Sequence, residues 1–399
     1  MEVREGYKKT EVGVIPEDWD CIKLRECIDN SKLGGNYAND PRNSQYPLIK
    51  MGNIGRGNIV LKKIDYIKNA VPCDEDKLKY GDVLFNTRNT LELVGKVAIW
   101  RNELPIAYYN SNLLCFTFNK EYISTNFFVN YMFNSKTMIN KLRNIATGTT
   151  SVAAIYSRDL WEIIIPIPPL PEQKAIASAL SDIYDLINSL AKLINKKKNI
   201  KQGAMQELLT GKKRLEGFNG EWVKLKLGEI CDIKKGQMIT GKTLEFGKIP
   251  VIAGGKQPAY YHKFPNRKGN TITISASGAN AGYVHFYKEP IFASDCSTIG
   301  EGSAYNLLYI YYNLLLKQSE IYIAQTGGAQ PHIHPRDIQL LIIKFPKTAE
   351  EQTAIANILS DMDKEIEALE SKLNKYKDIK QGMMQELLTG RIRLLEEVV

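Results

Sequence analysis

The sequence has little histidine, its cysteines are scattered, and it has no long hydrophobic run. Its four histidines and six cysteines show no Cys-x-x-Cys pair and no cluster at metal-ligand spacing, which argues against a zinc site and a disulfide framework. No stretch approaches the ~18 consecutive apolar residues of a membrane span, and the first residues lack the basic and apolar regions of a signal peptide. We therefore expect a cytoplasmic protein with reduced thiols, no metal and no membrane association.

Motifs of catalysis are also lacking. There is no G-x-S-x-G elbow and no Asn/Asp-Pro-Pro-aromatic stretch of the kind that amino-methyltransferases use. Residues 236–243 fit the P-loop pattern, but Gly247 and Pro250 leave no room for the helix that a phosphate-binding loop requires. Asp65 with residues 75–77 fits a Mg²⁺ nuclease motif only loosely. The sequence predicts a protein that is not itself an enzyme; an ATPase is the alternative that Lys242→Ala would test.

The chain has 399 residues, and this length suits two or three domains. Hydrophobic residues make up 44% and charged residues 24%, ordinary values for a globular protein. The net charge of +9 is suited to a polyanionic partner.

An internal repeat organises the chain. Residues 172–215 and 351–394 align without a gap and are identical at 26 of 44 positions. Each copy has apolar residues at alternating spacings of three and four, which predicts a helix with a coiled-coil seam. The predicted seam consists of Ile176, Leu180, Ile183, Ile187, Leu190, Ile194, Ile355, Leu359, Met362, Ile366, Leu369 and Leu373. Gly211 and Gly390 are predicted to cap the two helices.

The charges of the two copies are complementary. Residues 172–215 carry a net charge of +5 and residues 348–399 carry −4, which favours pairing of the two helices. Lys197 and Lys201 interrupt the seam of the first copy. Two interpretations are open: the helix pair splays there, or this segment contacts another subunit, which we favour.

The segments between the repeats are rich in short β-branched and aromatic runs, such as 81–85 and 269–274, which predict strands. Both segments begin with Trp and Leu five residues apart and end with Thr-Gly, Arg-Asp and an apolar run. We predict an α+β fold with two globular α/β domains separated by two long antiparallel helices, related by a pseudo-two-fold axis. The predicted segments are 1–165, 166–211, 212–347 and 348–399.

Polar loop residues of both globular segments are candidates for nucleic-acid binding, because their side chains match base edges and phosphates. In the first segment they are Arg42, Lys50, Asn53, Arg56, Asn58, Asn86, Arg88, Asn89, Tyr108, Tyr109 and Asn110. In the second they are Lys256, Gln257, Tyr260, Tyr261, His262, Arg267, Lys268, Ser277, Asn280, Gln330 and His332. For each of these residues, the alternative is that it is an ordinary solvent-exposed loop residue with no role in nucleic-acid binding.

The repeated modules E-Q-x-x-I-A, I-K-Q-G and Q-E-L-L-T-G, with the preceding stretch 163–170, resemble a known family. The chain is similar to the DNA specificity subunit (S, HsdS) of type I restriction–modification enzymes, and the resemblance covers essentially the whole chain. It implies two target-recognition domains that each read one half of a bipartite, asymmetric DNA site. It also implies that the helices set the spacing of the half-sites and dock two methyltransferase (M) subunits.

The resemblance further implies which cofactors are used by the assembly. S-adenosylmethionine, ATP and Mg²⁺ are expected on the methyltransferase and restriction (R) subunits and none on this chain. The rival interpretation is a stand-alone DNA-binding or scaffold protein whose helices pair in a homodimer.

Overall fold

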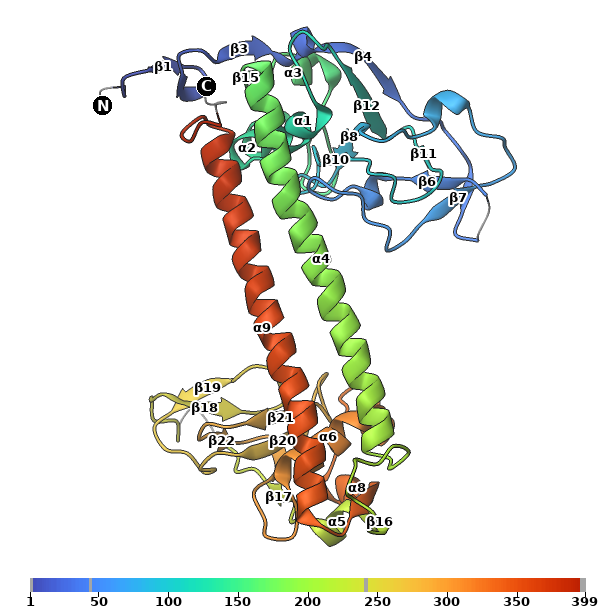
Figure 1. Cartoon of the computed structure of the whole chain (residues 1–399), viewed down its shortest axis with the longest axis vertical. Helices are drawn as coiled ribbons and strands as arrows, with labels where there is room; N and C mark the ends of the chain where they lie inside the picture. The colour runs from blue at the N-terminus through green and yellow to red at the C-terminus, as the bar shows by residue number, and fades with distance from the viewer. Residues whose placement is uncertain (1–2, 43–44, 240–242, 395–399) are drawn as a thin grey trace. The chain divides into compact units, whose positions relative to one another are not determined.

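The computed structural model describes residues 3–42, 45–239 and 243–394. The chain forms two compact units (Figure 1). Unit 1 comprises Met1–Ser189 and Leu373–Val399, and unit 2 comprises Leu190–Lys372. Each unit thus contains one globular part and a part of each long helix.

The two repeats form the long helices α4 (Leu170–Leu208) and α9 (Ala349–Leu387), each of 39 residues. At 1.5 Å per residue each is about 58 Å long. Gly211 and Gly390 follow them with φ of +65° and +69°, in the left-handed conformation that glycine adopts at low cost. The predicted helices and caps are confirmed.

The predicted seam is the buried side of both helices. In unit 1, Ile176 and Leu180 of α4 share a hydrophobic core with Leu387 of α9 and the globular part. In unit 2, Ile355 and Leu359 of α9 share a core with α4 and the second globular part. The start of each helix therefore packs beside the end of the other, which is an antiparallel arrangement within each unit. The first two seam residues of each helix also contact the globular part, which the coiled-coil pattern did not predict.

Unit 1 is built on short, mostly antiparallel strands. Its central sheet has the order β10-β8-β12-β4, with β4 (Ile28–Leu33), β8 (Val83–Asn86), β10 (Val97–Ile99) and β12 (Leu113–Phe118). A second sheet has the order β11-β6-β7-β5, with β5 (Asn39–Asp40), β6 (Pro47–Ile49), β7 (Asp65–Ile67) and β11 (Tyr108–Tyr109).

The remaining elements of unit 1 surround these sheets. The strands are β1 (Tyr7–Thr10), β2 (Gly13–Pro16), β3 (Asp20–Lys23), β9 (Arg88–Asn89), β13 (Thr147–Gly148), β14 (Ala153–Ala154) and β15 (Ile164–Ile167). The helices are α1 (Asn126–Phe133), α2 (Lys136–Ile145), α3 (Ser157–Trp161) and the 3₁₀ turns Leu24–Cys27, Met51–Asn53 and Asp74–Asp76. α1 packs on β10, and its Phe133 joins Phe85 and Phe116 of the central sheet in the main core.

Unit 2 repeats the topology of unit 1. Its central sheet has the order β21-β20-β23-β17, with β17 (Lys234–Lys235), β20 (Thr271–Ser275), β21 (Val284–Tyr287) and β23 (Cys296–Ile299). The second sheet is β19-β18-β22, with β18 (Ile249–Ile252), β19 (Tyr260–His262) and β22 (Phe292–Ala293). The parallel pair β18·β22 corresponds to the parallel pair β11·β6 of unit 1.

In both units the strand at the first Trp pairs with the strand before the long helix: β3, which follows Trp19, pairs with β15, and β16, which begins at Trp222, pairs with β24. The remaining elements are β16 (Trp222–Lys226), β24 (Ile342–Pro346), α5 (Leu227–Ile230), α6 (Leu307–Leu316), α7 (Gln318–Ile323) and α8 (Pro335–Gln339). The weak sequence echo between the globular segments thus corresponds to a repeated fold.

Candidate nucleic-acid interface

In each unit the central strand leads into a short three-segment ladder. In unit 1, β9 follows β8, and β9 pairs with β14, which pairs with β13. Arg88 lies opposite Ala154 in this register. In unit 2, Ser277 bridges to His332, which also bridges to Thr326. Arg88 and Ser277 therefore occupy corresponding positions, and so do Ala154 and His332.

A tight, exposed turn closes each ladder. Gly148 has φ +127° and Gly327 has φ +90°. A Cβ at Gly148 would lie 2.3 Å from the carbonyl oxygen of Val152, and one at Gly327 would lie 2.7 Å from that of Gln330. Residues 149–152 and 327–330 are all exposed. Each turn therefore presents its side chains to solvent on a backbone that the ladder holds in place.

A second loop lies against the ladder of unit 2. A Cβ at Gly254 would lie 2.6 Å from the carbonyl oxygen of Ser277, so glycine allows the β18–β19 loop to approach this closely. From that loop, Lys256 places its Nζ 5.2 Å from the ring centre of Tyr283. Ser277 also donates its hydroxyl hydrogen bond to the carboxylate of Asp295. The structure thus brings together Ser277 and His332, two residues selected from the sequence, and places the loop that carries Lys256 beside Ser277.

In unit 1, exposed Arg88 lies beside a small pocket with a volume of about 310 Å³. Asn112 and Tyr156 also line it, and Tyr156 is 53% exposed. Sequence reasoning missed these two residues and the exposed turn. The repeated Thr-Gly pair, now seen at the start of each turn, was the signal that could have identified the turn.

Several candidates are corrected because their side chains are inside the fold. Asn53 is buried and donates to the carbonyl oxygens of Val60 (2.9 Å) and Lys63 (2.7 Å), so it holds a loop. His262 is buried, with Nδ1 3.0 Å from the carbonyl oxygen of Glu245. The other buried candidates are Asn86, Tyr108 and Tyr109. These five side chains cannot reach a base from the positions that they occupy.

Other candidates are engaged within their own unit. Lys50 forms an ion pair with Asp65 at 2.8 Å, and Arg42 forms one with Asp40 at 2.6 Å. Five further candidates are only partly exposed or form hydrogen bonds with neighbouring protein atoms. They are Asn58, Asn89, Asn110, Arg267 and Asn280. The exposed ones are Gln257, Tyr260, Tyr261, Lys268 and Gln330.

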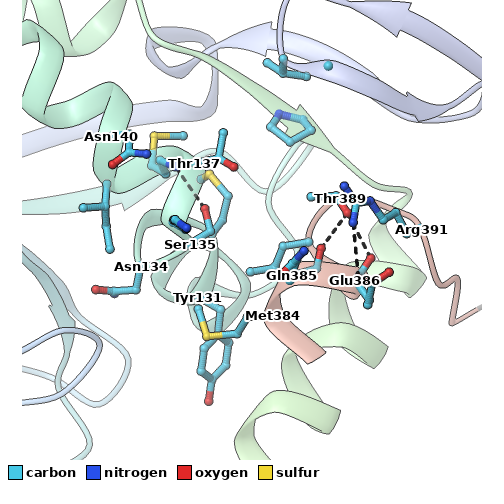
Figure 2. Close-up of a pocket in the computed structure, with 18 of the residues that line it drawn as sticks. Tyr131, Asn134, Ser135, Thr137, Asn140, Met384, Gln385, Glu386, Thr389 and Arg391 are labelled. Carbon is cyan, nitrogen blue, oxygen red and sulfur yellow. Dashed lines mark hydrogen bonds and ion pairs between the residues drawn. The ribbon is translucent and has the colours of Figure 1, made fainter. Parts of the chain in front are cut away.

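Arg56 lines a separate groove in unit 1, with a volume of about 1290 Å³. Figure 2 shows side chains of α1 and α2, among them Tyr131 and Thr137, facing Met384 of α9 and Arg391, which lies in the segment after α9. Arg56 is therefore not part of the ladder that contains Arg88.

The lysines that interrupt the seam form ion pairs across the helix pair in unit 2. Lys197 contacts Glu365 and Lys198 contacts Glu370, both at 2.6 Å, and Lys201 contacts Asp363. The charge pairing expected from the sequence is therefore confirmed here. The ion pairs of Lys197 and Lys201 with α9 argue against splaying of the helix pair at this point. Contact of this segment with another subunit stays a prediction.

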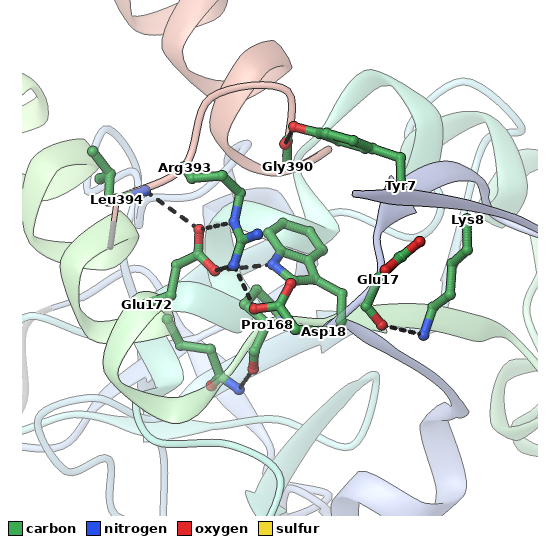
Figure 3. Close-up of polar contacts among 11 residues, drawn as sticks. Tyr7, Lys8, Glu17, Asp18, Pro168, Glu172, Gly390, Arg393 and Leu394 are labelled. Carbon is green, nitrogen blue, oxygen red and sulfur yellow. Dashed lines mark hydrogen bonds and ion pairs between the residues drawn. The ribbon is translucent and has the colours of Figure 1, made fainter. Parts of the chain in front are cut away.

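A buried polar cluster fastens the start of each long helix to its globular part. In unit 1, Arg393 donates to both carboxylate oxygens of Glu172 at 2.8 and 2.9 Å, and Trp19 Nε1 donates at 2.9 Å (Figure 3). In unit 2, Arg214 and Trp222 hold Glu351 in the same way. We call these the unit 1 lock and the unit 2 lock.

The glutamine after each glutamate completes the join. Gln173 donates to the carbonyl oxygens of Tyr122 and Pro168, and Gln352 donates to that of Pro346. The E-Q pair of the repeat therefore joins the helix to the globular part, and sequence reasoning did not assign it this role.

Electrostatics differ between the lock and the helix pair of unit 1. Hydrogen bonds to Glu172 raise the pKa of Arg393 above its ordinary value. Burial, and then the nearby charge of Arg101, lower the pKa of Lys380.

Among the helices that the structure describes, none has the length and apolar character that a membrane span requires. Within the same residues, no group of three or more His, Cys, Asp or Glu is placed to hold a metal. The P-loop match at 236–243 includes residues 240–242, which lie outside the described part.

Comparison with known proteins agrees with this architecture. The putative type I restriction enzyme MjaX specificity subunit of Methanocaldococcus jannaschii is 27% identical, and the alignment covers 98% of this chain and 97% of that protein. The MjaVIII specificity subunit of the same organism is 24% identical over 98% and 96%. The crystal structure of a type I restriction–modification S subunit from M. genitalium matches with a TM-score of 0.66 and 17% identity, covering 97% and 98% of the two chains.

The model of the type I restriction modification DNA specificity domain matches residues 16–202 and 219–377. The two matches coincide with the two globular parts and the helices that follow them. This domain confers DNA specificity on a complex and is not catalytic itself. The chain therefore belongs to the type I restriction–modification DNA specificity family.

Proposed function

We propose that each unit reads one half of a bipartite, asymmetric DNA site. The observation that carries this proposal is the ladder, which has the same backbone plan in both units but different side chains. Arg88 and Ala154 in unit 1 correspond to Ser277 and His332 in unit 2. Because side-chain donors and acceptors select bases, two ladders with different side chains would select two different half-sites.

The long helices set the gap between the half-sites in this proposal. Both have 39 residues and are joined at both ends to globular parts by the locks, so their length is not adjustable. Two methyltransferase subunits dock on the repeated elements, because a duplicated surface suits two copies of one partner. S-adenosylmethionine, ATP and Mg²⁺ belong to the methyltransferase and restriction subunits, and this chain acts in the cytoplasm.

Mapping of methylated adenines tests the proposal. The chain is co-expressed with its cognate methyltransferase in a methylation-free host, and modified adenines are located across the genome. We expect a split motif of two short blocks around a constant gap. Tight sequence-specific DNA binding by the chain alone, without association with the methyltransferase, would instead support the stand-alone DNA-binding alternative.

Matched substitutions assign the half-sites. We expect Arg88→Ala to relax one base position of one half-site and His332→Ala to relax a position of the other, each by about 1–3 kcal/mol of discrimination. Lys120→Ala, which changes an exposed cation away from the ladder, is the control and leaves both unchanged. Replacement of residues 216–347 by the corresponding domain of a relative changes only one half-site. A substitution in one ladder that altered both half-sites would refute the modular reading.

A further inference from the structure

The two ladders carry different side chains where they join the central sheets. In unit 1, Asn112 directly precedes β12, and its carbonyl oxygen accepts a hydrogen bond from the backbone of Thr87 at 3.3 Å. In unit 2, Asp295 directly precedes β23, and its carbonyl oxygen accepts one from the backbone of Ala276 at 3.1 Å. β12 pairs with β8, and β23 pairs with β20, both antiparallel. Asn112 and Asp295 therefore occupy corresponding positions, with an amide in one unit and a carboxylate in the other.

The carboxylate of Asp295 is oriented but not neutralised. One of its oxygens, Oδ2, accepts the hydroxyl hydrogen bond of Ser277, a ladder residue. Among the residues that the structure describes, no lysine, arginine or histidine forms an ion pair with Asp295, and its Oδ1 has no hydrogen-bond partner. Lys256, whose loop approaches Ser277, places its Nζ 5.2 Å from the ring centre of Tyr283 instead. Asp295 is partly exposed, so its Oδ1 is available to a bound molecule.

A carboxylate in this place restricts what can bind. It accepts hydrogen bonds and donates none, and its charge repels phosphate groups. In the major groove of DNA the hydrogen-bond donors are the exocyclic amino groups, N4 of cytosine and N6 of adenine. Against any other edge of a base, the charge of Asp295 would lose water and gain no hydrogen bond. The ladder of unit 2 therefore favours a base that presents an amino group.

The ladder of unit 1 has the opposite character. Arg88, which corresponds to Ser277, is exposed, and within the described residues it forms no ion pair with a carboxylate. Its guanidinium donates hydrogen bonds and accepts none, and the O6 and N7 acceptors of guanine match its geometry. Asn112, which lines the same small pocket, is neutral and does not oppose this choice. Two ladders with one backbone plan thus have opposite hydrogen-bonding roles.

We propose that Asp295 is a base-selecting residue of unit 2. Held by Ser277, its carboxylate accepts a hydrogen bond from the exocyclic amino group of a cytosine or an adenine, whereas Arg88 selects a base with acceptors in unit 1. The proposal rests on the proposed function, which places one half-site of DNA on each ladder. Reversal of the selected base pair moves the amino group to the other strand, so unit 2 distinguishes C·G from G·C, or A·T from T·A, at this position.

Base analogues test the proposal. The complex of the full chain with its cognate methyltransferase is titrated with duplexes that carry its methylated motif. Each duplex lacks one amino group of the unit 2 half-site, because 2-pyrimidinone replaces one cytosine or purine replaces one adenine. We expect one replacement to weaken binding by the wild type about tenfold. The base at which this occurs shows whether the amino group belongs to cytosine or to adenine.

An isosteric substitution shows whether Asp295 is the residue that contacts this amino group. Asp295→Asn keeps an oxygen for Ser277 and places an NH₂ group at the position of Oδ1, so a donor replaces the acceptor. We expect the variant to bind the parent duplex and the sensitive analogue duplex within about threefold of each other. Its affinity for unrelated DNA should rise, because a charge that repels phosphates has been removed. If this variant fails to fold, Asp295→Ser takes its place.

A matched control removes the same charge at the other end of the sheet. Glu289 is exposed and lies just after β21, beyond the pair of Tyr287 with Thr271 at the start of β20, whereas the ladder follows the end of β20. Glu289→Gln should retain the full sensitivity of the wild type to the analogue.

The outcomes separate the two proposals. Wild-type binding that is unchanged by every analogue, or a variant that keeps the full sensitivity, would overturn the role of Asp295 and leave the proposed function intact. An equal loss of affinity for all sequences in Asp295→Asn would assign the carboxylate to support of the fold and would also overturn its role in base selection. Absence of a split methylation motif for the wild-type complex would overturn both proposals.

Discussion

Removal of the arginine from one lock should destabilise only the unit that contains it. Glu172 is 2% exposed, and Arg393 supplies two of the hydrogen bonds to its carboxylate. In Arg393→Met the buried charge keeps only the N–H groups of Trp19 (2.9 Å) and Leu394 (3.3 Å) as partners. Loss of one partner of a buried ion pair typically costs 3–5 kcal/mol. Because the Arg393 side chain is 20% exposed, we expect the lower end, about 3 kcal/mol.

A second substitution separates the charge effect from the loss of packing. Glu172→Gln with Arg393→Met removes the buried charge, while the glutamine oxygen can still accept the hydrogen bond from Trp19. We expect the double variant to be about 1–2 kcal/mol less stable than the wild type, and thus more stable than Arg393→Met alone. Arg214→Met is the matched control, because it breaks the corresponding lock of unit 2.

Hydrogen exchange measured by mass spectrometry in increasing urea assigns each loss to a unit. Peptides of residues 3–42 and 45–189 should lose protection in Arg393→Met, and peptides of 190–239 and 243–372 should lose it in Arg214→Met. Equal losses in both units, or a double variant as unstable as Arg393→Met, would refute the reasoning that a buried unpaired carboxylate acts locally.

Three other perturbations have expected outcomes. Gly390→Ala should lower the free energy of unfolding more than Gly211→Ala does, by about 1 kcal/mol or more in chemical denaturation. Both glycines have positive φ. However, a Cβ added at Gly390 would lie 2.4 Å from Pro16, whereas one added at Gly211 would lie 3.1 Å from Trp222. Lys380→Met should stabilise unit 1 at pH 7, because burial lowers the pKa of Lys380 and the protonated form is disfavoured in the fold. This cost is fully present below the folded-state pKa and disappears as the pH rises past the ordinary lysine value of 10.5. The difference in stability between variant and wild type should therefore shrink in urea melts as the pH is raised from about 7 to above 10.5, and a constant difference would contradict the assignment. Insertion of a few residues at 206–211 should change the gap in the methylated motif and leave both half-sites unchanged, and a changed half-site would contradict the spacing role of the helices.

Local patterns in the sequence predicted the long helices well. The three-and-four spacing identified the apolar face, and Gly211 and Gly390 marked the ends because their caps require a left-handed backbone. Complementary net charge predicted pairing of the two repeats, and the pairs Lys197–Glu365 and Lys198–Glu370 confirm it. These features depend on residues close together in the chain, or on whole segments, so they do not require knowledge of the tertiary contacts.

The functional surface was less predictable. Asn53, His262 and Tyr109 have the side chains expected of a DNA contact, yet they are buried and hold loops or fill the core. Conversely, Tyr156 becomes exposed beside Arg88 although nothing in its local sequence indicates this. Whether a polar loop residue faces solvent depends on which distant segments pack against it.

By itself, the sequence determined the duplicated plan of this protein, the length and polarity of its helices and the absence of catalytic motifs. Only the tertiary structure decided that Glu172 and Glu351 pair with Arg393 and Arg214 in the two locks. It also decided that the two ladders present different side chains at corresponding positions, and that several arginine and lysine side chains line one groove of unit 1. These arrangements join residues more than a hundred positions apart, as in Glu172 and Arg393. Such contacts are set by packing between elements, which short-range periodicity and composition do not encode.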